Sequence, residues 1–104
     1  MKDYIDRRFL NKGSYHTLAA ICAKCEIDEE ELKRDTRWGI NAELSISDCN
    51  RVIDLDMNTH TDKDFNNSLY KLRQIEKTVK FFREYLEELR EEVNKLKKDE
   101  KNNN

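Results

Sequence analysis

The chain lacks any run of about eighteen apolar residues, and its first eight residues lack the apolar centre of a signal peptide. We therefore expect neither a membrane-spanning helix nor secretion. Three cysteines, an odd number, do not form a disulfide framework, so a cytoplasmic location is expected. The formal net charge of -2 provides no field that would draw the chain to nucleic acid or to an anionic membrane.

Proline is absent, and the two glycines, Gly13 and Gly39, are too far apart to form a phosphate-binding loop. Lys, Asn, Asp, Glu and Ile are abundant instead, which is typical of AT-rich bacterial or phage genomes. Charged residues make up 40% of the 104 residues and hydrophobic residues 37%. This is more charge than an average globular domain carries, so the chain can bury only a modest core of its own.

Metal-site patterns are incomplete. Cys22 and Cys25 form a C-x-x-C motif, but a second such pair is missing. Cys49, His16 and His60 would complete a zinc site only if the fold brought them together. On a strand, Cys22 and Cys25 would point to opposite faces, which opposes chelation. Since no nucleophile has a recognisable spacing from His16 either, we predict no metal, no cofactor and no enzymatic activity.

A second pattern, Asp54-x-Asp56-x-Asn58, begins like a calcium-binding loop. The pattern then fails, because Thr59 occupies the glycine position and Phe65 the position of the bidentate glutamate. We interpret these acids as the outer face of a strand that leads into a helix. A Mg²⁺ or Mn²⁺ site built from the same oxygens is the alternative.

The strongest feature is a heptad pattern in the last third of the chain. Counted from Phe65, nine of ten core positions are apolar, and Ser68 is the exception. We call these positions the heptad seam: Phe65, Ser68, Leu72, Ile75, Val79, Phe82, Leu86, Leu89, Val93 and Leu96. The surrounding apolar surface is broad at first, and from Leu86 onward it narrows to the core positions alone, as in a helix that packs on another helix.

This narrowing predicts a homo-oligomer, with a dimer favoured, through an interface made of Leu86, Leu89, Val93 and Leu96. The flanking charges suit a parallel pair, and an antiparallel pair stays open because Lys71 could then meet Glu92. The alternative is a monomer whose helix folds entirely onto its own domain.

Alternating residues predict strands before this helix. Residues 38–47 and 51–57 alternate between apolar and polar positions and form a hairpin around Ser47-Asp48-Cys49-Asn50. Residues 15–27 fit a strand better than a helix, followed by a short helical turn that Asp28 caps. Residues 1–13 suggest a short helix from Asp3 to Gly13. The expected inward side chains include Trp38, Leu44, Ile46, Ile53 and Leu55.

The predicted fold class is α+β: a small antiparallel sheet of two or three strands packed on one long C-terminal amphipathic helix that extends into a coiled-coil-like seam. We expect a mainly β head in residues 1–60, the helix in residues 61–98 with Thr61 as its cap, and a disordered tail in residues 99–104. The first half of the helix is expected to cover the sheet.

The predicted function is a non-catalytic oligomeric binding module that presents its sheet face or inter-subunit cleft to a protein target. The alternative is a small phage-type or bacterial protein that sequesters a small ligand, such as a nucleotide signal, or blocks a host factor. Nucleic acid is disfavoured because acids intersperse the basic clusters. The candidate ligand or partner face consists of Glu43, Asp54, Asp56, His60, Arg37 and Arg51.

Overall fold

The computed structural model describes residues 2–13, 18–35, 38–48 and 50–102. The chain divides into two compact units, Met1–Leu69 and Tyr70–Asn104. The first unit contains a four-stranded sheet, a short helix and the first turns of a long helix, and the second contains the rest of that helix. The α+β class and the long C-terminal helix are thereby confirmed.

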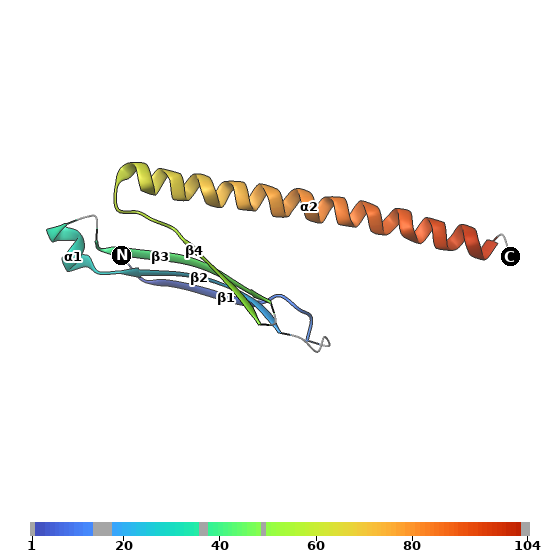
Figure 1. Ribbon diagram of the computed structural model, residues 1–104, viewed down its shortest axis with the longest axis horizontal. Helices are drawn as coiled ribbons and strands as arrows, with labels where there is room; N and C mark the ends of the chain where they lie inside the picture. The colour runs from blue at the N-terminus through green and yellow to red at the C-terminus, as the bar shows by residue number, and fades with distance from the viewer. Residues whose placement is uncertain (1, 14–17, 36–37, 49, 103–104) are drawn as a thin grey trace. The chain divides into compact units, whose positions relative to one another are not determined.

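The sheet is an antiparallel meander, in which strands that are consecutive along the chain lie side by side (Figure 1). Its strands are β1 Tyr4–Phe9, β2 Ala19–Ile27, β3 Ile40–Asp48 and β4 Arg51–Asp56, and helix α1, Glu29–Arg34, connects β2 to β3. The strand interpretation of residues 15–27 is confirmed from Ala19 onward, and residues 14–17 lie outside the described residues. Asp48 pairs with Arg51, which confirms the predicted hairpin.

The short helix predicted near the N-terminus is wrong, and the sheet has four strands rather than two or three. Tyr4–Phe9 pairs instead with β2 over its own whole length, from Tyr4 opposite Cys25 to Phe9 opposite Ala20. Asp3, which was expected to cap a helix, accepts a 2.7 Å hydrogen bond from the backbone N–H of Ile27. Six residues are too few to reveal a helical or strand period, so pairing with β2 decides their conformation.

The strand register gives the sheet two distinct faces. The apolar face carries Ile21, Ala23, Cys25 and Ile27 of β2, Ile40, Ala42, Leu44 and Ile46 of β3, and Ile53 and Leu55 of β4. The polar face carries Ala20, Cys22, Lys24 and Glu26 of β2, Asn41, Glu43, Ser45 and Ser47 of β3, and Val52, Asp54 and Asp56 of β4. Successive side chains of a strand alternate between the two faces, as the sequence of β3 predicts.

The core of the first unit is small. Among the described residues, its buried side chains are Ala19, Leu44, Met57 and Ser68, each with 9% or less of its surface exposed. The predicted burial of Leu44 is confirmed. The predicted burial of Trp38 and Ile53 is wrong, since they are 60% and 59% exposed. Trp38 precedes the first residue of β3, so strand alternation does not apply to it, and Ile53 lies on an edge strand.

Helix α1 is fixed at its two ends by the residues that flank it. The carboxylate of Asp28 accepts a 3.1 Å hydrogen bond from the N–H of Glu31, which confirms the predicted cap. The N–H of Asp28 donates to the carbonyl oxygen of Gly39 at 2.8 Å, so the ends of the β2–β3 connection lie together. Gly39 is buried against Leu32, with no room for a side chain.

Helix α2 spans Asp62–Asn102 and therefore continues beyond its predicted end at Lys98. Its 41 residues give a length of about 60 Å. The hydroxyl of Thr61 accepts a 3.1 Å hydrogen bond from the N–H of Asp64, and its carbonyl accepts one of 2.9 Å from the N–H of Phe65. Thr61 is thereby confirmed as the cap. Arg83 and Glu87 form an ion pair of 2.8 Å along the helix surface.

Candidate functional site

Three of the predicted face residues gather on the polar face of the sheet. Glu43 of β3 pairs directly with Asp56 of β4, and Asp54 pairs with Ser45. The Ser45 hydroxyl donates a 2.9 Å hydrogen bond to Glu43. Directly opposed carboxylates repel each other. Lys24 of β2 lies directly opposite Glu43 on its other side, so this part of the polar face combines three acids with one lysine and keeps an excess of negative charge.

The other predicted face residues lie elsewhere. Arg51 is paired with Asp48 at the end of the β3–β4 hairpin, in the register of the apolar face. His60 follows β4 and packs against Trp38, with 4.8 Å between the ring centroids and 48° between the ring planes. Arg37 lies outside the described residues. The five described residues of the candidate face therefore do not share one surface of the sheet.

The imidazole of His60 also lines a cavity of about 370 Å³ at the beginning of α2. The other lining residues are Leu32, Ile40, Thr59, Thr61, Asp62 and Phe65. This cavity is bordered by α1, by the first residue of β3 and by the residue that caps α2. Of its polar residues, Thr61 caps α2 and His60 packs against the ring of Trp38.

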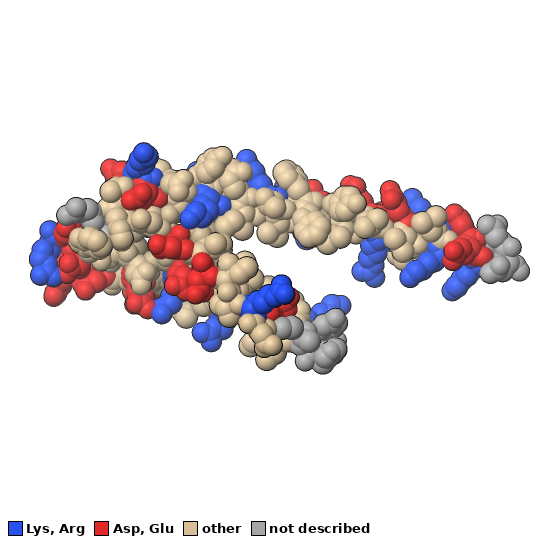
Figure 2. Space-filling model, viewed as in Figure 1, with Lys and Arg blue, Asp and Glu red and all other residues tan. Residues whose placement is uncertain are grey.

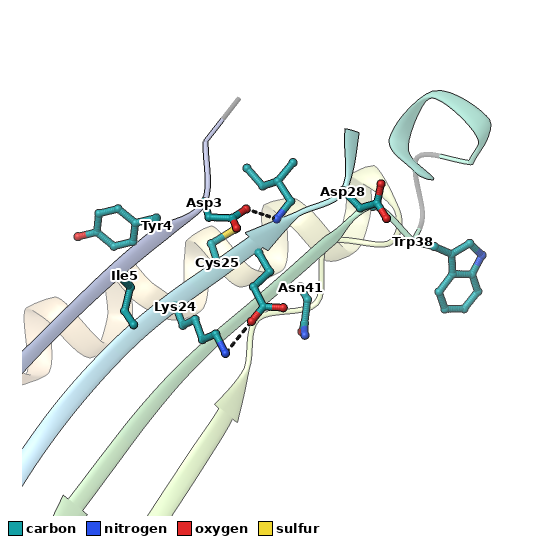
Figure 3. Close-up of a pocket in the computed structure, with 11 residues that line it drawn as sticks. Asp3, Tyr4, Ile5, Lys24, Cys25, Asp28, Trp38 and Asn41 are labelled. Carbon is teal, nitrogen blue, oxygen red and sulfur yellow. Dashed lines mark hydrogen bonds and ion pairs between the residues drawn. The ribbon is translucent and has the colours of Figure 1, made fainter. Parts of the chain in front are cut away.

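A larger cavity, of about 470 Å³, lies where β1 begins and β2 ends, and we call it the sheet-end cavity (Figure 3). Its lining residues are Asp3, Tyr4, Ile5, Lys24, Cys25, Glu26, Ile27, Asp28, Trp38, Gly39 and Asn41. Sequence reasoning did not find it, because the residues that β1 contributes were assigned to a helix. No motif in the sequence indicates that these segments converge.

The charged side chains of the sheet-end cavity are already paired, whereas the thiol of Cys25 is free. Lys24 and Glu26 form an ion pair of 2.6 Å, drawn as a dashed line in Figure 3. The hydrogen bond to Glu26 and the charge of that carboxylate raise the pKa of Lys24 above its ordinary value. Lys24 therefore stays protonated at neutral pH and cannot act as a base. Asp3 accepts a hydrogen bond from the N–H of Ile27 and Asp28 caps α1, so both carboxylates already hold the backbone at the end of β2 and the start of α1.

The described cysteines do not converge. Cys22 lies on the polar face opposite Ser45, and Cys25 lies on the apolar face opposite Ala42. Both are free thiols, half-buried in the sheet. Within the described ranges, no three His, Cys, Asp or Glu side chains are grouped closely enough to bind a metal ion. Cys49 and His16 lie outside those ranges.

The second unit consists, over its described residues 70–102, of α2 alone. Six apolar side chains of the heptad seam lie along it, and we call them the C-terminal seam: Val79, Phe82, Leu86, Leu89, Val93 and Leu96. They are between 39% and 65% exposed. A shallow groove of about 380 Å³ runs between Val79, Phe82 and Leu86 on one side and Arg83, Glu87 and Arg90 on the other. A single helix has no second element on which to bury such a seam.

Charged side chains of both signs border the C-terminal seam (Figure 2). The positions on either side of it carry Arg83, Arg90 and Lys97 on one flank and Thr78, Tyr85 and Glu92 on the other. All six are exposed. In paired helices, an apolar stripe forms the interface, and the charges on its flanks determine the partner and its orientation.

No family model, no curated protein and no solved structure matches the chain. In the part of the chain that the structure describes, no helix is both long enough and apolar enough to cross a membrane.

Proposed function

We propose that the protein is a non-catalytic, homo-oligomeric binding module. The C-terminal seam of α2 holds two copies together, and the sheet binds a protein target. The observation that carries this proposal is the exposed row of six apolar side chains on a unit that contains a single helix.

The size of the seam is consistent with a reversible dimer. Removing the remaining exposed half of one such side chain from water contributes about 1 kcal/mol. Six side chains from each of two copies then contribute on the order of 12 kcal/mol, against a cost of association of about 4–15 kcal/mol. The four residues from Leu86 alone would contribute on the order of 8 kcal/mol by the same estimate, so the whole seam, including Val79 and Phe82, gives the larger margin over this cost.

The polar face is the surface that we propose for the target. Its cluster of Glu43, Asp54 and Asp56 is negatively charged, so it favours a partner with basic side chains. Since Cys22 and Cys25 are free thiols, we place the module in the reducing cytoplasm.

A pair of adjacent substitutions tests the assembly. Val93→Asp puts a carboxylate into the seam, whereas Asn94→Asp puts the same group beside it on the outer surface of α2. We expect wild type and Asn94→Asp to sediment as dimers at tens of micromolar, and Val93→Asp to sediment as a monomer, because a carboxylate buried among apolar side chains is strongly unfavourable. Leu89→Asp added to Val93→Asp should complete the dissociation.

The fluorescence of Trp38 should be the same in all of these variants, since Trp38 belongs to the first unit. A monomeric wild type at these concentrations would overturn the proposal. A Val93→Asp variant that remains dimeric would show that another surface makes the dimer.

The sheet-end cavity favours a second candidate function, the binding of a small ligand. Its volume of about 470 Å³ lies within the usual range of ligand pockets, and Tyr4 and Trp38 provide aromatic surface. Asp3, Glu26 and Asp28 also line it, so a cationic or uncharged ligand suits it better than a phosphate-bearing one. Native mass spectrometry of the purified protein tests this function, because a retained small molecule would appear as added mass on wild type and be lost on Trp38→Ala.

A further inference from the structure

We infer that the occupant of the C-terminal seam is a second copy of this chain that lies parallel and in register with the first. This inference rests on the proposed function and adds the orientation of the partner helix. Val79 and Val93 at the first core position of their heptads, with Leu89 and Leu96 at the second, favour two strands in such an arrangement.

The charges that border the seam agree with a parallel pair. In that arrangement, each residue of the flank that contains Thr78, Tyr85 and Glu92 meets the residue five positions further along on the other copy. Glu92 then meets Lys97 of the second copy, and Tyr85 meets Arg90, whose guanidinium can lie on the ring face. Thr78 meets Arg83. All these side chains are exposed, and none of these pairs places like charges together.

An antiparallel pair over the same segment is less favourable. If the two helices cross between Leu86 and Leu89, Arg83 of each copy faces Arg90 of the other, so the centre of the arrangement contains two pairs of like charges, and the opposite charges of Glu76 and Lys97 meet only towards the ends of the overlap. A crossing half a heptad nearer the N-terminus instead brings the two Arg83 side chains together at the axis, with Glu76 of each copy meeting Arg90 of the other. Like charges at such positions oppose the pairing.

A longer antiparallel overlap would avoid these repulsions, because Lys71 would meet Glu92 and Glu76 would meet Arg83. It would also set Val93 of one copy against Ser68 of the other. Ser68 is 5% exposed within the first unit, and its hydroxyl donates a 2.6 Å hydrogen bond to the carbonyl oxygen of Asn58. Its side chain is therefore already occupied, and the seam of α2 cannot extend to this position.

A charge exchange tests the orientation. Glu92→Lys places lysines opposite Lys97 in both flanking pairs of a parallel dimer, and we expect the dissociation constant to rise about tenfold. Lys97→Glu added to Glu92→Lys restores the pair with its signs reversed and should return the constant to near that of wild type. Glu91→Lys makes the same charge change one residue away, outside the pairing, and should leave the constant within about twofold of wild type. Sedimentation equilibrium at fixed salt measures all four proteins.

Rescue of Glu92→Lys by Lys71→Glu rather than by Lys97→Glu would show the long antiparallel pair and overturn the parallel orientation. A Glu92→Lys variant with unchanged affinity would also overturn it, because Glu92 then faces no charge. In both cases the dimer itself would stand. A monomeric wild type would overturn the proposed function instead.

Discussion

The hydroxyl of Ser68 donates a 2.6 Å hydrogen bond to the carbonyl oxygen of Asn58. This bond ties the second turn of α2 to the segment that leaves β4, and Ser68 is one of the few buried side chains of the described chain. It explains why the heptad seam contains one polar residue. At this position the helix packs within its own unit, and the seam that is available to a second copy begins further along.

Ser68→Ala should therefore destabilise the first unit. It removes the donor of a part-buried hydrogen bond to the Asn58 carbonyl, which costs about 0.5–1.5 kcal/mol. Urea unfolding followed by Trp38 fluorescence, at one fixed protein concentration, measures the loss. Asn67→Ala, at the exposed preceding residue, is the control and should change stability by less than about 0.5 kcal/mol. Equal stabilities of the two variants would contradict the role given to Ser68.

The two glycines should respond in opposite ways to alanine. A Cβ atom at Gly39 would lie 2.2 Å from the Cγ of Leu32 and 2.7 Å from its backbone nitrogen. A rotamer change of Leu32 cannot relieve the second clash, so Gly39→Ala should cost about 1–3 kcal/mol. Nothing lies within 4 Å of the corresponding position at Gly13, so Gly13→Ala should be neutral or slightly stabilising. Thermal unfolding of both variants checks this, and a stable Gly39→Ala would mean that α1 is packed differently.

Two apolar residues of the same sheet face should contribute differently to the free energy of unfolding. Leu44 is 9% exposed on the central strand β3, whereas Ile53 is 59% exposed on the edge strand β4. Leu44→Ala should cost about 2–5 kcal/mol, and Ile53→Ala less than about 1 kcal/mol. Urea unfolding of both variants provides the comparison. A large loss at Ile53 would show that a second copy or a partner covers the apolar face.

Metal removal should leave the protein unchanged. Cys22 and Cys25 lie on opposite faces of the sheet, so one ion cannot bind both. We expect no stoichiometric metal in native mass spectra and the same melting temperature with and without a chelator. A structural site would couple metal binding to folding, so a chelator would then lower the melting temperature sharply. About one zinc per chain would refute this prediction and direct attention to Cys49, His16 and His60.

Part of the candidate site could be predicted from the sequence. Strand alternation places Glu43, Asp54 and Asp56 on the outer side of a hairpin, and the register confirms that they share one face. The same alternation puts Arg51, two residues before Ile53, in the register of the apolar face, as the structure shows, so its inclusion in the candidate face went against the pattern. Alternation could not predict that His60 packs against Trp38, because that contact depends on the path of the chain after β4, which leaves no periodic signal.

The sequence by itself determined the features whose causes are local. Thr61 and Asp28 cap their helices through bonds to residues three positions ahead, and a heptad repeat makes α2 one long helix. Tertiary structure alone decided the rest. The segment Tyr4–Phe9 is a strand because β2 offers it a row of backbone partners, and the sheet-end cavity exists because β1 lies there. Backbone pairing between distant segments has no sequence period. Strand β1 and the cavity beside it could therefore be seen only in the folded chain.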